Sequence, residues 1–243
     1  MEFIVIKIGG VASQQLTPEI LETLKSWHQA GKHLVIVHGG GFAINQLMEE
    51  HQVQVTKING LRVTQKAEMA LVKTALVDVV GRSLTSSLLE EGLPAVQLVD
   101  QLDTIVKADF LEQATYGYVG QVSQIVVEPL LDLLEQGQIP VIPCLGFSLQ
   151  GDMLNINADY LATAVATSLK AQQLILMTDV KGVMEDGLLL DVLHLSDIGD
   201  KIKQGIITGG MVPKVESAAK TVLAGVGQVL IGDQLTGGTQ IKE

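Results

Sequence analysis

The sequence is poor in several residue types, and each scarcity excludes a class of protein. Cys144 is the only cysteine among 243 residues, so no internal disulfide can form, and this usage is typical of a reducing compartment. Aromatic residues make up 3% of the chain, so aliphatic side chains must fill the core. The five histidines show no metal-ligand spacing, and we therefore expect no dedicated metal site.

Basic residues are also scarce, with 16 Lys and Arg against 27 Asp and Glu and a formal net charge of -11. This balance argues against a nucleic-acid-binding surface, which needs clustered cations. No apolar run approaches the length that spans a bilayer, and the opening MEFIVIKIGG is too short and too acidic for a signal peptide. We expect a soluble, cytoplasmic protein with neither a nucleic-acid nor a membrane partner.

Short aliphatic runs alternate with longer segments of helical spacing. Strands are expected at residues 3–8, 33–38, 95–99, 139–145, 174–180 and 228–232. Helices are expected at residues 18–30, 67–91, 126–137 and 160–171. Nearly continuous apolar strands that alternate with helices predict an α/β fold, a three-layer αβα sandwich around a mainly parallel central sheet.

Four more polar segments with turn residues interrupt this alternation. They lie at residues 54–64, 103–110, 117–123 and 145–159, and we interpret them as hairpins over the carboxyl edge of the sheet. Ligands of open α/β folds bind at that edge, so these hairpins are expected to act as lids and substrate walls. No linker, repeat or charge block divides the chain.

Two expected strands end in glycines. The run HLVIVH leads into Gly39, Gly40 and Gly41 and then a helix, while FIVIKI leads into Gly9 and Gly10. Residues without a Cβ let backbone amides approach a ligand closely, and the amino end of a helix favours an anion. Such glycines often form plain tight turns, but neither a P-loop nor a dinucleotide fingerprint fits this sequence. An anion site on another scaffold is predicted.

Two lysines occupy unusual places. Lys7 stands between Ile6 and Ile8 in a strand suited to full burial, where an ammonium without a purpose would be costly, although a strand-end lysine can also simply reach solvent. Lys214 lies near the amino end of a helix opened by Gly209–Gly210, where the helix dipole opposes a cation. A bound phosphate would resolve that conflict.

Further polar residues precede or flank expected helices and turns. Asn155, Asn157 and Asp159 alternate in LNINAD, so an extended backbone would place all three on one face, where capping explains only one of them. They would then hold a ligand or a lysine. Arg62, in the NGLRVT turn, is either a solvated hairpin arginine or a bidentate carboxylate ligand. The TDVKGV turn, residues 178–183, either has only a structural role or forms part of the wall of a nucleotide site.

Taken together these motifs resemble the amino acid kinase family, in order and over nearly the whole chain. The motifs are KIGG, VIVHGGG, NGLRVT, LNINAD, TDVKGV and GGMVPK. The resemblance implies the amino acid kinase fold as one domain over residues 1–243, with an acceptor lobe at about residues 1–170 and an ATP lobe at about 171–243. It implies transfer of the γ-phosphoryl group of MgATP to the side-chain carboxylate of N-acetyl-L-glutamate, with Mg²⁺ bound through the ATP phosphates.

The resemblance also implies a role for individual residues. Lys7 and Lys214 would stabilise the transferring phosphoryl group, and Asp159 would hold both ammonium groups. The acceptor would be bound by Gly40, Gly41, Arg62 and Asn155. The ATP site would comprise Gly9, Gly10, Asp179, Val180, Lys181, Gly182, Val183, Met184, Ile206, Ile207 and Thr208. A carboxylate acceptor is already ionised at neutral pH, so the reaction needs cations and amides rather than a base.

Alternatives remain open at this stage. A kinase of the same fold could act on an N-modified aminoadipate, a carbamate or uridine monophosphate, or the chain could be a catalytically silent nucleotide-binding regulator. Arginine-inhibited relatives resemble hexamers joined by an extra amino-terminal helix, and here the first strand begins almost at Met1. The resemblance therefore implies an arginine-insensitive homodimer, with its contact on the helical segment at residues 65–91.

Overall fold

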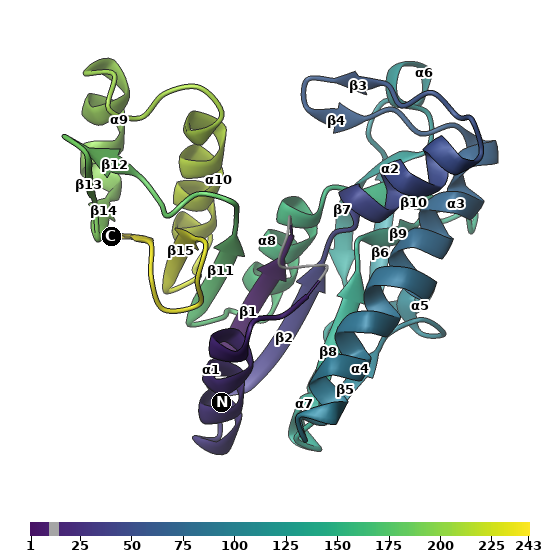
Figure 1. The fold of residues 1–243 in the computed structure, drawn as a ribbon, viewed down its shortest axis with the longest axis horizontal. Coiled ribbons are helices and arrows are strands. Elements are labelled where there is room, and N and C mark those ends of the chain that lie inside the picture. Colours follow the sequence, from purple (N-terminus) through teal and green to yellow (C-terminus); the bar gives the residue numbers. More distant parts are fainter. Residues whose placement is uncertain (10–14) are drawn as a thin grey trace.

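An eight-stranded sheet runs through the centre of the computed structural model, which describes residues 1–9 and 15–243 (Figure 1). Its strand order is β14-β16-β15-β11-β1-β2-β8-β5. The strands are β1 (Phe3–Ile8), β2 (His33–His38), β5 (Ala95–Gln97), β8 (Ile139–Pro143), β11 (Gln173–Met177), β14 (Val192–His194), β15 (Gln228–Gly232) and β16 (Thr239–Lys242). Every neighbouring pair is parallel except β15 and β16, so the predicted mainly parallel sheet is confirmed.

The central strands are apolar on both faces because helices flank the sheet. Ile4, Val5 and Ile6 of β1 are fully buried, as are Val35–Val37 of β2. Lys7 is the one charged residue of β1, and it lies in register with Val37 on one side and Leu176 on the other. The sheet therefore brings this lysine into the middle of the molecule, between two buried strands.

Helices form at all four predicted segments, but the one at residues 67–91 is divided into several helical stretches, and the helices at residues 102–105, 113–116 and 195–203 were not predicted. The helices are α1 (Pro18–Gln29), α2 (Gly41–Glu50), η2 (Lys66–Glu68), α3 (Met69–Lys73), the π-helical η3 (Thr74–Gly81), α4 (Arg82–Glu90), α5 (Leu102–Ile105), α6 (Gln113–Tyr116), α7 (Glu128–Glu135), α8 (Ala158–Ser168), α9 (Leu195–Lys203) and α10 (Met211–Leu223). Helix α8 packs on β1 and β11 and against α10. This packing brings the first turn of α8 beside the central strands.

A second, smaller sheet closes on itself as a four-stranded barrel. It consists of β6 (Val106–Phe110), β7 (Val119–Ile125), β9 (Leu145–Phe147) and β10 (Met153–Ile156). The predicted hairpins within residues 103–110 and within 117–123 were wrong, because each segment supplies one strand, β6 and β7, of a single antiparallel pair joined through α6. The segment at 145–159 does contain the β9–β10 hairpin. The closure of the four strands into a barrel was not predicted.

The predicted turn at residues 54–64 is a hairpin of β3 (Lys57–Ile58) and β4 (Leu61–Arg62). Its two turn residues, Asn59 and Gly60, both have positive φ, at 51° and 80°. Positive φ at both central positions is the type I′ geometry that suits a tight two-residue hairpin. The hairpin therefore places Arg62 at a defined position, opposite Lys57.

Several strand boundaries differ from the prediction. The run at 95–99 ends at Gln97, the run at 174–180 ends at Met177, and the run at 139–145 is divided between β8 and β9 at Cys144. The very short strands β12 (Met184–Glu185) and β13 (Leu188–Leu189) were not predicted, because two residues carry no readable periodicity.

Candidate active site

Lys7 projects from β1 toward the first turn of α8. Its side chain is only 11% exposed, and its Nζ lies 2.9 Å from Asp159 Oδ1. The same ammonium donates a hydrogen bond to the carbonyl of Met177, at 3.1 Å, where the neighbouring strand β11 ends. Both contacts favour a charged amine, so this ammonium is fixed in place rather than left to reach solvent.

Asp159 owes its position to the way α8 begins. Asn157 is the N-cap of α8, and its side-chain oxygen accepts hydrogen bonds from the backbone N–H groups of Asp159 and Tyr160. The expectation that Asn155, Asn157 and Asp159 share one extended face was therefore wrong. Asn157 is explained by capping, while Asp159 belongs to the first helical turn and carries the predicted role of holding a lysine.

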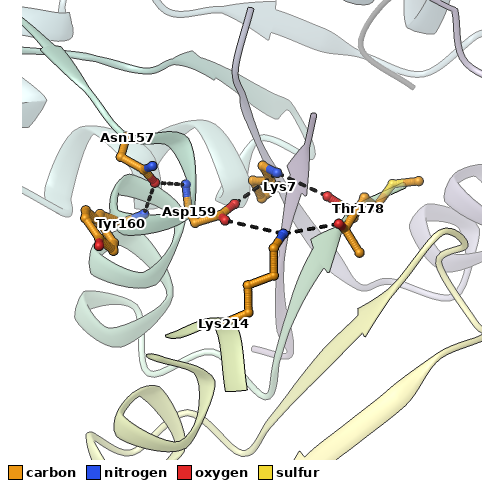
Figure 2. A network of polar contacts seen from close by, with 7 residues as sticks. Lys7, Asn157, Asp159, Tyr160, Thr178 and Lys214 are labelled. Carbon is orange, nitrogen blue, oxygen red and sulfur yellow. Dashed lines mark hydrogen bonds and ion pairs between the residues drawn. The ribbon is translucent and has the colours of Figure 1, made fainter. Parts of the chain in front are cut away.

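Lys214 reaches the same carboxylate from α10. Its Nζ lies 3.9 Å from Asp159 Oδ2 and donates a hydrogen bond to Thr178 Oγ1 at 3.1 Å. The Asp159 carboxylate thus offsets the unfavourable interaction between the Lys214 ammonium and the dipole of α10. Figure 2 shows the two amines approaching one carboxylate from different elements, Lys7 from the first strand and Lys214 from the last long helix.

Gly9 follows β1 and lies against the Lys7 side chain. A Cβ built on Gly9 would fall 2.5 Å from Lys7 Nζ and 2.8 Å from Lys7 Cε. A side chain at position 9 would therefore displace the end of the Lys7 side chain from its place. Gly10, predicted with Gly9 to contact phosphate, lies outside the described residues.

A cavity of about 210 Å³ lies near Asp159 and Lys214, and all four residues predicted to bind the acceptor line it. It is lined by Gly39, Gly40, Gly41, Ile44, Lys57, Gly60, Leu61, Arg62, Val119, Cys144, Asn155, Ile156, Asn157 and Ala158. A Cβ on Gly41 would meet nothing within 4 Å, whereas one on Gly40 would fall 2.8 Å from Leu76 Cδ2 of the π-helical segment. Gly40 thus allows close packing of η3, and Gly41 leaves the start of α2 open to the cavity.

Arg62 is the fixed cation of this cavity. Its Nη2 donates hydrogen bonds to Asn45 Oδ1 and to the carbonyl of Gly41, while its Nη1 is buried and has no hydrogen-bond partner among residues 1–9 and 15–243. Burial lowers the pKa of the guanidinium, although the nearby Glu68 carboxylate opposes that shift. A buried N–H group of an arginine is suited to a carboxylate ligand.

Two further polar groups are buried near this cavity: Asn155 lines it, and His38 precedes Gly39, which also lines it. Asn155 Nδ2 donates to Thr64 Oγ1 at 3.1 Å, which orients its amide. His38, at the end of β2, is fully buried with Nδ1 3.1 Å from the carbonyl of Gly39, and burial lowers the pKa of its imidazole to about 4. A neutral imidazole therefore lies under the first residue of the glycine turn.

A second cavity, of about 280 Å³, adjoins the first on the side of the lysines. Asp159 and Lys214 line it, and it shares Gly60, Leu61 and Asn157 with the Arg62 cavity. The β3–β4 hairpin and the start of α8 thus border both spaces. This arrangement places the Arg62 cavity next to a space lined by Asp159, the carboxylate that contacts both ammonium groups.

The predicted nucleotide residues occupy two segments near the Lys214 side. Gly182, Val183 and Ile207 are buried, and the remaining described ones are partly or fully exposed: Asp179, Val180, Lys181, Met184, Ile206 and Thr208. Gly182 has a φ of 143°, and the Val183 N–H donates to Thr239 Oγ1 at 2.8 Å. These contacts fix the turn against β16, while the exposed members remain accessible.

Sequence reasoning missed several residues of the site. Lys57 and Cys144 line the Arg62 cavity, and the Thr178 hydroxyl accepts a hydrogen bond from Lys214. The pairing of Lys57 with Arg62 across a type I′ hairpin was readable from the NG turn. Cys144 was noted only for its redox meaning; burial raises the pKa of its thiol to about 12, so the thiol is neutral at physiological pH.

The described residues contain no group of three or more His, Cys, Asp or Glu side chains that could hold a metal ion. Within the same part of the chain, no helix combines the length and apolar character needed to cross a membrane. The site itself offers two amines, one carboxylate that contacts both, an arginine and backbone amides. Such groups can bring two anions together and neutralise charge that develops between them.

Comparisons with known proteins agree with this geometry. The profile of the Amino acid kinase family matches residues 2–233. Acetylglutamate kinase of Streptococcus mutans serotype c is 58% identical over 240 residues, 99% of this chain and 98% of that protein. Acetylglutamate kinase of Streptococcus sanguinis is 52% identical over 242 residues, 100% of this chain and 99% of that protein.

A solved structure extends the likeness to the fold. The crystal structure of smu.665 from Streptococcus mutans UA159 superposes with a TM-score of 0.92 at 58% identity, covering 99% of this chain and 98% of that one. The family profile spans most of the chain, and the relatives match it from end to end. The chain belongs to the amino acid kinase family.

Proposed function

We propose that this protein transfers the γ-phosphoryl group of MgATP to the side-chain carboxylate of N-acetyl-L-glutamate, giving N-acetyl-L-glutamyl 5-phosphate, a step of arginine biosynthesis. The observation that carries the proposal is the position of two amines on one carboxylate, directly beside a cavity that holds Arg62. The names of the 58% and 52% identical relatives support N-acetyl-L-glutamate as the acceptor over a longer N-modified aminoadipate.

Phosphoryl transfer to a carboxylate requires positioning and charge neutralisation rather than a general base, because the acceptor is already an anion at neutral pH. We assign to Lys7 and Lys214 the stabilisation of the phosphoryl group as negative charge spreads over its oxygens. Asp159 keeps the two amines at a fixed separation by contacting both. Mg²⁺ enters with ATP as part of that substrate, held by its phosphates.

Acceptor recognition is assigned to the Arg62 cavity. The buried Nη1 of Arg62 and the Asn155 amide supply polar contacts, and the open start of α2 at Gly40–Gly41 supplies backbone N–H groups. The two cavities share three residues, which supports an acceptor whose side-chain carboxylate points toward Lys7 and Lys214.

We further propose two lobes, about residues 1–170 for the acceptor and about 171–243 for ATP. The exposed segments at 179–184 and 206–208 would bind the nucleotide, with Gly9 and Gly10 contacting its phosphates through their amides. Figure 1 supports this division, since α9, α10 and β12–β16 gather on one side of β1 and the elements of the Arg62 cavity on the other. The site would thus lie where the lobes meet.

A cytoplasmic homodimer completes the proposal. Val79 of η3 and Leu89 of α4 are 46% and 53% exposed on the long helical segment, which supports a subunit contact there. Light scattering of the purified protein should give twice the mass of one chain. A monomeric mass at micromolar concentration would overturn this part alone.

The reaction is tested by trapping the acyl phosphate with hydroxylamine. Purified protein with MgATP and N-acetyl-L-glutamate should give the hydroxamate, with far less from N-acetyl-L-aminoadipate and none without acceptor. A preference for the longer acceptor would overturn the substrate assignment. Absence of hydroxamate with every acceptor would overturn the proposed reaction.

A further inference from the structure

Arg62 is held by a residue that no motif of the sequence singled out. Asn45 lies on α2, one turn after Gly41, and its Oδ1 accepts a hydrogen bond from Arg62 Nη2. The same Nη2 also donates to the carbonyl of Gly41 at 3.4 Å. One nitrogen of the guanidinium is therefore tied to the first turn of the helix that follows the glycine turn.

We propose that Asn45 is a positioning residue that directs Arg62 into the acceptor cavity and so sets the KM for the acceptor. The inference rests on the proposed function for its kinetic readout. Asn45 acts through Arg62, because it is absent from the cavity lining while Arg62 is part of it.

The guanidinium of Arg62 has separate N–H donors on Nη1 and Nη2, and these point in different directions. Arg carries a planar fork of five N–H donors, so fixing Nη2 also fixes the direction of Nη1. Arg62 Nη1 is buried and has no partner among residues 1–9 and 15–243, and a buried N–H group without a partner is costly. The Asn45 contact thus keeps Nη1 where a carboxylate in the cavity can accept from it.

A purely structural role for Asn45 fits less well. The Asn45 side chain is exposed, and an exposed neutral hydrogen-bond acceptor adds little to folding stability. Glu68, the acid whose charge acts on Arg62, accepts a hydrogen bond from the backbone N–H of Gln65 at 2.8 Å and so has a partner of its own. Asn45 is therefore the side chain that orients the guanidinium.

Steady-state kinetics of three variants test the inference. Asn45→Ala should raise the KM for N-acetyl-L-glutamate about tenfold, the scale of one hydrogen bond to a charged group, with kcat within about twofold of wild type. Asn45→Asp keeps the oxygen acceptor but adds a carboxylate that competes with the acceptor for Arg62, so its KM should also rise. Gln46→Ala is the matched control, because Gln46 is also exposed on α2 and its side chain bonds only Glu50 among the described residues.

A double-mutant cycle separates positioning from a general effect on α2. In an Arg62→Ala background, Asn45→Ala should have no further effect on KM, because its route to the acceptor is already removed. An equal rise of KM in both backgrounds, or no rise in the single variant, would overturn the inference while leaving the proposed reaction intact.

A crystal structure of the Asn45→Ala variant provides a readout that does not depend on the reaction. We expect the guanidinium of Arg62 to turn away from Gly41 and to withdraw Nη1 from the cavity. An unchanged guanidinium would overturn the positioning role, whereas inactivity of the wild-type protein toward N-acetyl-L-glutamate would count only against the proposed function.

Discussion

The proposed acceptor side and the proposed nucleotide side of the molecule are built in different ways. Arg62, Asn155 and Gly41 come from separate elements yet line one cavity of about 210 Å³, and hydrogen bonds to Asn45, Thr64 and the backbone cross-link them. The predicted nucleotide residues instead include two exposed apolar side chains in the segment at 179–184, Val180 and Met184, which are 46% and 44% exposed. Fixed polar groups thus characterise one side, and accessible apolar surface the other.

The charged centre lies between these sides and depends on both. Lys7 comes from β1 and is 11% exposed, while Lys214 comes from α10 and is 31% exposed. Asp159 joins the two, at 2.9 Å and 3.9 Å respectively. The tighter half of this centre lies on the proposed acceptor side, so changes there should have the largest effects.

Removing the Lys7 ammonium should have the largest effect of all. Lys7→Ala is expected to lower kcat about 1,000-fold, since one electrostatic donor contributes about 10²–10³ and the Asp159 carboxylate is left partly unpaired. Lys214→Ala should lower kcat somewhat less, about 100-fold. Rates come from hydroxamate formation and folding from circular dichroism, with the surface variant Lys32→Ala as control. Rates near wild type for either would refute the assignment.

Arg62→Ala should separate binding from chemistry. We expect the KM for N-acetyl-L-glutamate to rise about 100-fold with a smaller change in kcat, because the arginine contacts the part of the acceptor that does not react. The KM for ATP should stay within about twofold. A KM for the acceptor that does not change would show that the Arg62 cavity is not the acceptor site.

The buried imidazole of His38 should make the acceptor side sensitive to acid. The pKa of His38 is about 4 in the folded protein against an ordinary 6.5, so between these values only the unfolded chain takes up the proton. Stability is therefore full above about pH 6.5 and falls as the pH drops toward 4. Between pH 7 and pH 5 this group should cost about 2 kcal/mol.

Urea unfolding at both pH values measures that change. His38→Asn removes the titrating group and should lose less stability than wild type over the same interval. Equal losses in the two proteins would mean that His38 is not the source of the acid sensitivity.

The smallest effect is expected on the nucleotide side. Met184→Ala should raise the KM for ATP only about threefold, because an exposed thioether contributes a small apolar contact. The KM for the acceptor should be unaffected. A larger rise in the KM for the acceptor than in the KM for ATP would contradict the division between the two sides.

Sequence alone predicted the parts of this site whose signals are local. The strand that carries Lys7 is a continuous apolar run, and the type I′ hairpin that carries Arg62 contains an NG turn, so both were placed correctly. The meeting of Lys7 and Lys214 at Asp159 was proposed from family resemblance, because residues 7, 159 and 214 are joined only by the packing of α8 between β1 and α10.

What the sequence could not supply depends on long-range packing. The alternation of Asn155, Asn157 and Asp159 suggested one extended face, but the helix begins at Ala158 and separates them. The Asn45 contact joins α2 to the β3–β4 hairpin, and closure of the small barrel joins β6 and β7 to the later strands β9 and β10. Hydrophobic patterning reports which face is buried and does not report which polar side chains meet.

The crowding between Gly9 and Lys7 has a consequence for protein engineering. In a saturation library, every codon at position 9 other than glycine should displace the ammonium, so such variants should fold and yet turn over slowly. The lack of a side chain at position 9 therefore leaves the space that the Lys7 amine occupies.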